Sequence, residues 1–136
     1  MNPDMPDTPA PAATPDTILD RALLCVRAAL EKKAFDVKLL DVRGLTSIGD
    51  YFVLLSGRSD TQVRAIAEAV ETEVRRSGYK SMAIEGSQLG RWVLIDLGDI
   101  LVHVFHQPVR EFYDLERLWS KATAVALPAD LAAAAQ

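Results

Sequence analysis

The chain has 136 residues, of which 49% are hydrophobic and 25% are charged, a composition typical of one globular domain with its own core. Because no run approaches the roughly 18 apolar residues of a membrane-spanning helix and the N-terminal segment lacks the pattern of a secretory signal, we expect a cytoplasmic protein with no membrane partner. The net charge of −4 comes entirely from Asp4, Asp7, Asp16 and Asp130, so the electrically balanced middle of the chain does not favour direct DNA or RNA binding as the main activity.

The two ends of the chain differ in composition from the middle. Five of the seven prolines lie in the first fifteen residues, which predicts a disordered Pro/Ala-rich tail over residues 1–15. Residues 122–136 are rich in alanine and contain Pro128 as a helix breaker, so a second, flexible tail is expected there. One α/β domain over residues 16–121 remains.

The first predicted element is an amphipathic helix that Asp16 caps and that runs to about Lys33. Its apolar residues recur near helical spacing and comprise Ile18, Leu19, Ala22, Leu23, Val26 and Leu30. The single cysteine, Cys25, lies on the same side, which indicates a buried thiol with no disulfide and no redox role.

Two strands and a second helix are predicted next. Residues 37–42 and 51–55 are short runs of branched and aromatic residues separated by turn residues. Ser59 and Gln62 then form a capping box at a helix start, and Gly78 is placed to end that helix. The apolar stripe of this helix consists of Val63, Ile66, Ala67, Val70 and Val74.

A β-hairpin is the clearest local feature of the second half. A third strand over residues 79–84 and a polar loop over 85–90 lead to strands 91–97 and 100–106, joined by a two-residue Gly98-Asp99 turn. If Leu97 lies opposite Ile100, one face of the hairpin is wholly aliphatic and belongs to the core. The other face pairs Trp92 with Phe105, Leu94 with His103, and Asp96 with Leu101.

A last helix is expected to start near Asp114 and to dock on the sheet through Leu115, Leu118 and Trp119. The order of elements is then helix, two strands, helix, three strands, helix. This order predicts an α/β (α+β) fold with a single mixed sheet flanked by helices.

No catalytic or metal-binding set can be assembled from these elements. His103 and His106 are three residues apart on a strand and so point to opposite faces, and no cysteine completes a zinc site. Ser59, His103 and Asp96 are the components of a hydrolase triad, but no G-x-S-x-G nucleophile motif occurs. We therefore expect no catalytic residue, no metal and no cofactor.

The segment from Gly57 to Asp60 is the best enzymatic candidate, because a glycine-serine element at a helix start can bind phosphate, as in nucleotidyltransferases. Those enzymes also need strand-borne carboxylates that hold magnesium. Here the nearby acids, Glu68, Glu71 and Glu73, lie on the polar side of a helix. The alternative interpretation is that Ser59 only caps the helix.

Large aromatic residues also allow two interpretations, since they dominate both cores and protein-binding hot spots. Trp119 lies on the apolar stripe of the last helix and is expected in the core. Trp92 begins a strand on its mixed face, next to Arg91 and near Glu85, so either burial or exposure on a partner surface fits its position.

Two long segments carry a resemblance to a known family. They are DYFVLLSGRSDTQVRAIA over Asp50–Ala67 and GRWVLIDLGDILVHVFHQPVREFYDLERLW over Gly90–Trp119. Both are similar to the ribosomal silencing factor (RsfS) family, also called the Iojap family. The resemblance covers residues 17–121. Gly49 and the Gln107-Pro108 pair depart from the usual family residues.

The resemblance implies a nucleotidyltransferase-like topology without the catalytic carboxylates, and a protein that is not an enzyme. It also implies binding to protein uL14 of the large ribosomal subunit, which blocks joining of the small subunit and represses translation under nutrient limitation. Relatives also tend to form homodimers when off the ribosome. The alternatives are a large-subunit assembly factor and a residual nucleotidyltransferase.

A surface for a basic ribosomal protein is expected where acidic residues surround apolar ones on the mixed hairpin face. The residues predicted for this contact are Glu85, Trp92, Leu94, Asp96, Asp99, His103 and Tyr113.

Overall fold

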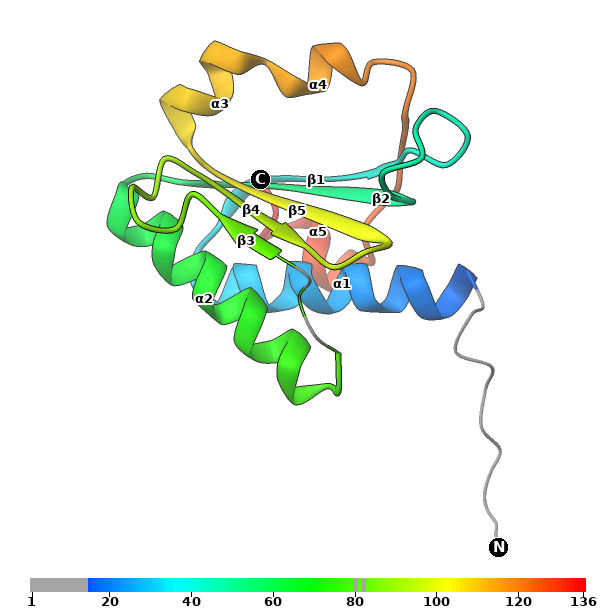
Figure 1. Cartoon of the computed structure of the whole chain (residues 1–136), viewed down its shortest axis with the longest axis horizontal. Coiled ribbons are helices and arrows are strands. Elements are labelled where there is room, and N and C mark those ends of the chain that lie inside the picture. Colours follow the sequence, from blue (N-terminus) through cyan, green and yellow to red (C-terminus); the bar gives the residue numbers. More distant parts are fainter. Residues whose placement is uncertain (1–14, 80, 82) are drawn as a thin grey trace, which may run out of the picture.

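The computed structural model describes residues 15–136 except residues 80 and 82 (Figure 1). The tail predicted for residues 1–15 therefore lies outside the described residues, apart from Pro15, where the first helix begins. In chain order the elements are α1 (Pro15–Glu31), β1 (Phe35–Asp41), β2 (Tyr51–Gly57), α2 (Asp60–Arg76), β3 (Ala83–Glu85), β4 (Trp92–Asp96), β5 (Ile100–His106), α3 (Gln107–Tyr113), α4 (Leu115–Leu118), β6 (Thr123–Ala124) and α5 (Ala129–Ala132).

The strands form one six-stranded sheet in the order β3-β4-β5-β2-β1-β6. The central strands β2 and β5 are parallel, and the other neighbouring pairs are antiparallel. A parallel pair needs a long crossover, which α2, β3 and β4 provide between β2 and β5. The predicted single mixed sheet flanked by helices is confirmed.

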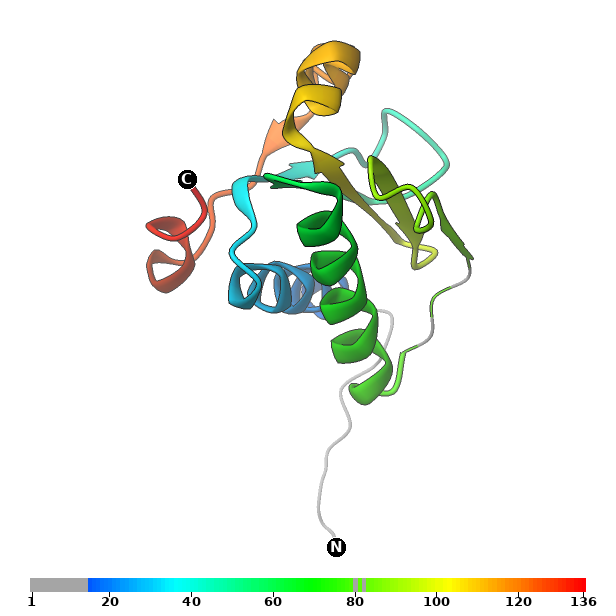
Figure 2. The same ribbon diagram turned by 90° about the vertical axis from the view of Figure 1, so that its left-hand side faces the viewer.

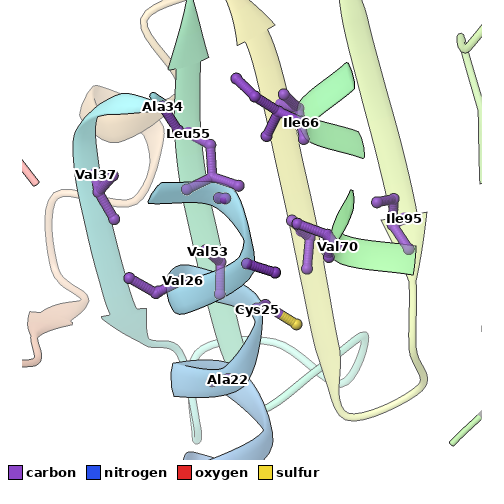
Figure 3. Close-up of a cluster of buried hydrophobic side chains, with 14 of the residues drawn as sticks. Ala22, Cys25, Val26, Ala34, Val37, Val53, Leu55, Ile66, Val70 and Ile95 are labelled. Atoms are coloured by element: carbon purple, nitrogen blue, oxygen red, sulfur yellow. The ribbon is translucent and has the colours of Figure 1, made fainter. Parts of the chain in front are cut away.

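Helices α1 and α2 cover one face of this sheet (Figures 1 and 2). Figure 3 shows Val26 of α1 and Val53 of β2 in the buried aliphatic cluster between these layers, together with Ile66 and Val70 of α2. Cys25 lies in the same cluster, and burial raises the pKa of its thiol to about 12. The thiol is therefore protonated at neutral pH and a poor nucleophile.

Helices α3 and α4 lie on the opposite side of the sheet (Figure 1). A second and smaller buried cluster lies there and contains two aromatic rings, since Phe52 and Phe105 pack in it with Leu115 of α4. Trp92, Leu94 and three other partly buried residues are packed against this cluster. This face is thus only partly covered.

The hairpin register is confirmed. Trp92 pairs with Phe105, and Leu94 pairs with His103. Gly98 has the positive φ (+89°) that its turn requires. β3 begins later than predicted, at Ala83, and it includes Glu85, which had been expected in the loop. Residues 80 and 82 of the predicted strand lie outside the described residues.

The predicted helix boundaries need two corrections. Asp16 lies inside α1 rather than before it, because the helix starts at Pro15. The helix expected from Asp114 is only the short α4, and α3 precedes it, with Pro108 in its first turn and Asp114 at a positive φ (+49°) between the two helices. The predicted docking is right for Leu115 but wrong for Leu118, which is 75% exposed. Trp119, expected in the core, is only partly buried and packs against the second cluster.

The C-terminal residues are also packed, which differs from the flexible tail expected over residues 122–136. β6 pairs with β1, and the Val37 N–H donates to the carbonyl oxygen of Ala135 at 2.8 Å. Leu131 of α5 is buried in the first cluster. This segment therefore covers the β1 edge of the sheet. Among the described residues, no helix combines the length and the apolar character needed to cross a membrane.

Candidate protein-binding surface

Trp92 is the centre of the partly covered face. It begins β4, and its half-buried ring lies 4.9 Å from the Phe105 ring and 5.1 Å from the Tyr113 ring, centroid to centroid. The preceding loop can reach Trp92 only because Gly86 has no side chain, since a Cβ at that position would overlap the Trp92 carbonyl oxygen. β4, β5 and α3 together hold the indole at the surface.

Trp92 lines two separate hollows. The first has a volume of about 370 Å³ and is bounded by Arg91, Trp92, Pro108, Val109, Phe112 and Tyr113. The second, of about 360 Å³, is bounded by Glu85, Gly86, Trp92 and Leu94. Each hollow combines an apolar lining with one charged residue at its border. A side chain from a partner protein fits such a shape better than a small polar substrate does.

His103 lies beneath this surface rather than on it. Only 7% of the residue is exposed, and its Nδ1 accepts a hydrogen bond from the Trp92 indole N–H at 3.2 Å. Burial lowers the pKa of His103 from 6.5 to about 4, so the imidazole is neutral at physiological pH. His103 was predicted as a contact residue, but its burial leaves little of the side chain for direct contact with a partner.

The structure brings only some of the predicted contact residues together. Glu85 and Leu94 share a hollow with Trp92, and Tyr113 packs on its ring. Asp96 is on the same strand face but accepts the Gly98 N–H at 2.8 Å, so it stabilises the turn. Asp99 lies 3.5 Å from Arg21 of α1 and does not join this surface.

Arg110 is an important residue that the sequence analysis did not single out. The residue is 2% exposed, and its guanidinium makes two hydrogen bonds with the Glu116 carboxylate, at 2.9 and 3.2 Å. It also donates to Ser56 Oγ at 2.8 Å and to the Asp36 carbonyl oxygen at 2.6 Å. These hydrogen bonds hold the pKa of Glu116 below its usual value. Arg110 thus fixes α3 and α4 to β1 and β2.

The possible phosphate-binding loop at the start of α2 is occupied by the protein's own side chains. Ser59 Oγ accepts the Gln62 N–H at 3.1 Å, which confirms the helix cap. Gln62 Oε1 accepts the Arg58 N–H at 2.6 Å, and Asp60 Oδ1 accepts the Thr61 N–H at 2.8 Å. Three N–H groups that would bind a phosphate are therefore already paired.

The acids near this loop do not form a metal site. Glu68, Glu71 and Glu73 lie on α2, as the sequence indicated. His106 lies at the end of β5 and its ring donates to the carbonyl oxygen of Arg58 at 3.1 Å. Within the described part of the chain, no three His, Cys, Asp or Glu side chains are close enough to hold a metal ion.

Comparisons with known proteins agree with the resemblance found in the sequence. The family described as "Ribosomal silencing factor during starvation" matches residues 15–136. The chain is 41% identical over 104 residues to ribosomal silencing factor RsfS of Bacillus subtilis, a match that covers 75% of this chain and 88% of the relative. It is 32% identical over 125 residues to the chloroplastic protein Iojap of Zea mays, covering 92% of this chain and 54% of the relative.

Solved structures show the same fold. A crystal structure of a Bacillus halodurans protein superimposes with a TM-score of 0.72 at 39% identity, covering 80% of this chain and 99% of the other. A Chromobacterium violaceum protein superimposes with a TM-score of 0.75 at 34% identity, covering 82% and 95%.

Proposed function

The chain belongs to the family of ribosomal silencing factors, and from that membership we propose that it binds protein uL14 of the large ribosomal subunit and so prevents the small subunit from joining. The mechanism is steric occupation by a cytoplasmic factor that is not an enzyme and needs no cofactor. Its effect is lower translation when nutrients are limited.

The observation that carries this proposal is the partly covered sheet face around Trp92. Phe112 is 81% exposed and Tyr113 is 54% exposed, and both border the hollow that Trp92 lines. Large aromatic residues next to such hollows are the typical anchors of protein interfaces. A catalytic protein would instead converge polar groups into one pocket.

The charges around Trp92 are of both signs, and they support a protein partner that carries complementary charges at the edge of the contact. Glu85 borders one hollow and Arg91 borders the other, and both side chains are exposed. Exposed rim charges mainly set orientation and association rate, whereas the apolar centre provides affinity. A basic side chain of uL14 next to Glu85 and an acidic one next to Arg91 would fit this arrangement.

We also propose that this face forms a homodimer when the protein is off the ribosome. Aromatic residues as exposed as Phe112 and Tyr113 are unfavourable in water, and a two-fold dimer would cover the same surface on both copies. If one face serves both purposes, binding to the large subunit and dimerisation exclude each other. Dimer formation would then compete with silencing.

The test mixes purified small and large subunits with excess protein and follows joined ribosomes by sedimentation. We expect the protein to migrate with free large subunits and the joined particles to decrease. Joined particles at their full level, with the protein remaining at the top of the gradient, would contradict the proposal. Bovine serum albumin at the same concentration controls for nonspecific crowding.

A further inference from the structure

We propose that His103 is a positioning residue that holds the Trp92 indole in its binding orientation from beneath. The role rests on the proposed function, since it concerns the surface that we assign to the ribosome. The observation behind it is that the Trp92 indole N–H donates to Nδ1 of a buried imidazole, at 3.2 Å.

The imidazole is itself fixed by aromatic rings. The His103 ring stacks nearly parallel to the Phe105 ring, with an angle of 9° between planes and 6.0 Å between centroids. The Phe52 ring meets it edge-on at 5.3 Å. Because β5 and β2 place these three residues in one sheet, the acceptor nitrogen has a defined position. The indole N–H can therefore be satisfied in one orientation of the Trp92 side chain.

The buried imidazole lowers the stability of the folded protein, which an aliphatic residue at the same position would not do. Since Nδ1 accepts a hydrogen bond, the neutral imidazole must carry its proton on Nε2. Nε2 is buried and has no hydrogen-bond partner among the described residues. A buried donor without an acceptor destabilises the folded state, and the surroundings of His103 are mainly apolar or aromatic. An aliphatic residue would pack there without this penalty.

This loss of stability distinguishes two explanations of why a histidine occupies position 103. If it served only the core, replacing it with an apolar side chain of similar size would lower neither stability nor binding. If it positions Trp92, the same replacement leaves stability unchanged or raises it, yet weakens the partner contact. The half-buried indole N–H is then free to bond to water and to change its orientation.

Two variants of the full chain make this test. His103→Leu removes the acceptor and keeps a similar volume, whereas His103→Asn retains an amide oxygen near the place of Nδ1. The first readout is hydrogen exchange of the Trp92 indole proton in the free protein, measured by NMR. Its resonance is assigned with Trp92→Phe, which leaves only that of Trp119. The second readout is the affinity for large ribosomal subunits, and the third is thermal unfolding.

For His103→Leu we expect faster indole exchange, an unchanged or higher melting temperature and an affinity lower by about 3- to 10-fold, the effect of one hydrogen bond. His103→Asn should exchange slowly and bind more tightly than His103→Leu. If either the indole exchange or the affinity of His103→Leu matches the wild type, the proposal is overturned.

The exchange measurement also separates this inference from the proposed function. If the wild-type protein fails to bind large subunits but His103→Leu still exposes the indole proton, the ribosomal function is wrong and the positioning contact stands. If the wild type binds and the indole proton is equally protected in both proteins, the positioning role is wrong and the function stands.

Discussion

The two faces of the sheet are built from different chemistry. On the face beneath α1 and α2, side chains such as Ile95, Val102 and Val104 are aliphatic and fully buried. On the opposite face, a buried imidazole and a half-buried indole lie among aromatic rings, and exposed Phe112 lines a hollow together with that indole. The strands alternate, so neighbouring residues of β4 and β5 serve opposite faces.

The difference indicates a division of roles. The aliphatic face can be optimised for packing alone, because α1, α2 and the C-terminal segment that contains Leu131 cover it. The mixed face must keep polar groups in defined places and leave part of its apolar surface open. We therefore expect changes on the first face to alter stability only, and changes on the second to alter recognition as well.

Within the mixed face, the largest expected effect belongs to Arg110, whose ion pair fixes the cover of that face. Arg110→Ala should lower the free energy of unfolding by about 3 kcal/mol, because it leaves Ser56 and Glu116 without their buried partner. Chemical denaturation measures this change. Arg117→Ala, an exposed arginine of α4, is the control and should change stability by less than about 0.5 kcal/mol. Equal stabilities of the two variants would contradict the role of Arg110.

The stability of the protein should also depend on pH through His103, which lies on the mixed face. The pKa of His103 is about 4 in the folded protein and 6.5 when unperturbed, so between these values the unfolded chain binds a proton that the folded chain does not. Stability is therefore full above pH 6.5 and falls as the pH decreases to 4, by about 3 kcal/mol.

His103→Leu is the control for this pH effect. It should lack the loss between pH 6.5 and 4, while effects of acids such as Glu116, whose pKa is lowered, remain in both proteins. The measurement is a series of denaturant titrations at several pH values. Parallel curves for the two proteins would show that His103 does not titrate as its burial requires.

A binding prediction compares one residue from each face. Trp92→Ala should weaken binding to the large subunit by about 30-fold, or about 2 kcal/mol, as expected for an aromatic anchor. Ile95→Ala, on the aliphatic face, should lower stability by about 2–5 kcal/mol and leave the affinity of the folded protein unchanged. Affinity is measured below the melting transition of both variants. Loss of binding in Ile95→Ala alone would reverse the assignment of the faces.

The smallest expected effect is electrostatic. Glu85→Lys should slow association with the large subunit about 3-fold at low salt, with less effect at high salt, because an exposed rim charge acts mainly through steering. Glu68→Lys makes the same change of charge on exposed α2, on the other side of the sheet, and should have no effect. Stopped-flow or surface-based kinetics would separate the two. Equal slowing would mean that only net charge matters.

The hairpin shows which features local sequence determines. Gly98 defines the turn, and alternation then assigns every residue from Trp92 to His106 to one face. The cap at Ser59 was equally predictable, because it depends on residues within one turn of the helix. The family resemblance, carried by two long segments, is confirmed by the comparisons.

The features that sequence reasoning missed depend on distant contacts. Arg110 bonds to Asp36 and Ser56, which are 74 and 54 positions away in the chain, and no local pattern reports such a contact. Similarly, the alanine-rich C-terminal segment has little helical periodicity, and its order comes from pairing with Val37 at the β1 edge. Asp99 was assigned to the wrong surroundings because α1 brings Arg21 beside it.

Site-specific photo-crosslinking tests the assignment of the mixed face most directly. Benzoylphenylalanine replaces exposed Phe112 beside Trp92 in one protein and exposed Arg75 of α2 in another, and each is irradiated with large subunits. We expect position 112 to crosslink to uL14 and position 75 not to do so. Crosslinking of uL14 from position 75, with none from position 112, would contradict it.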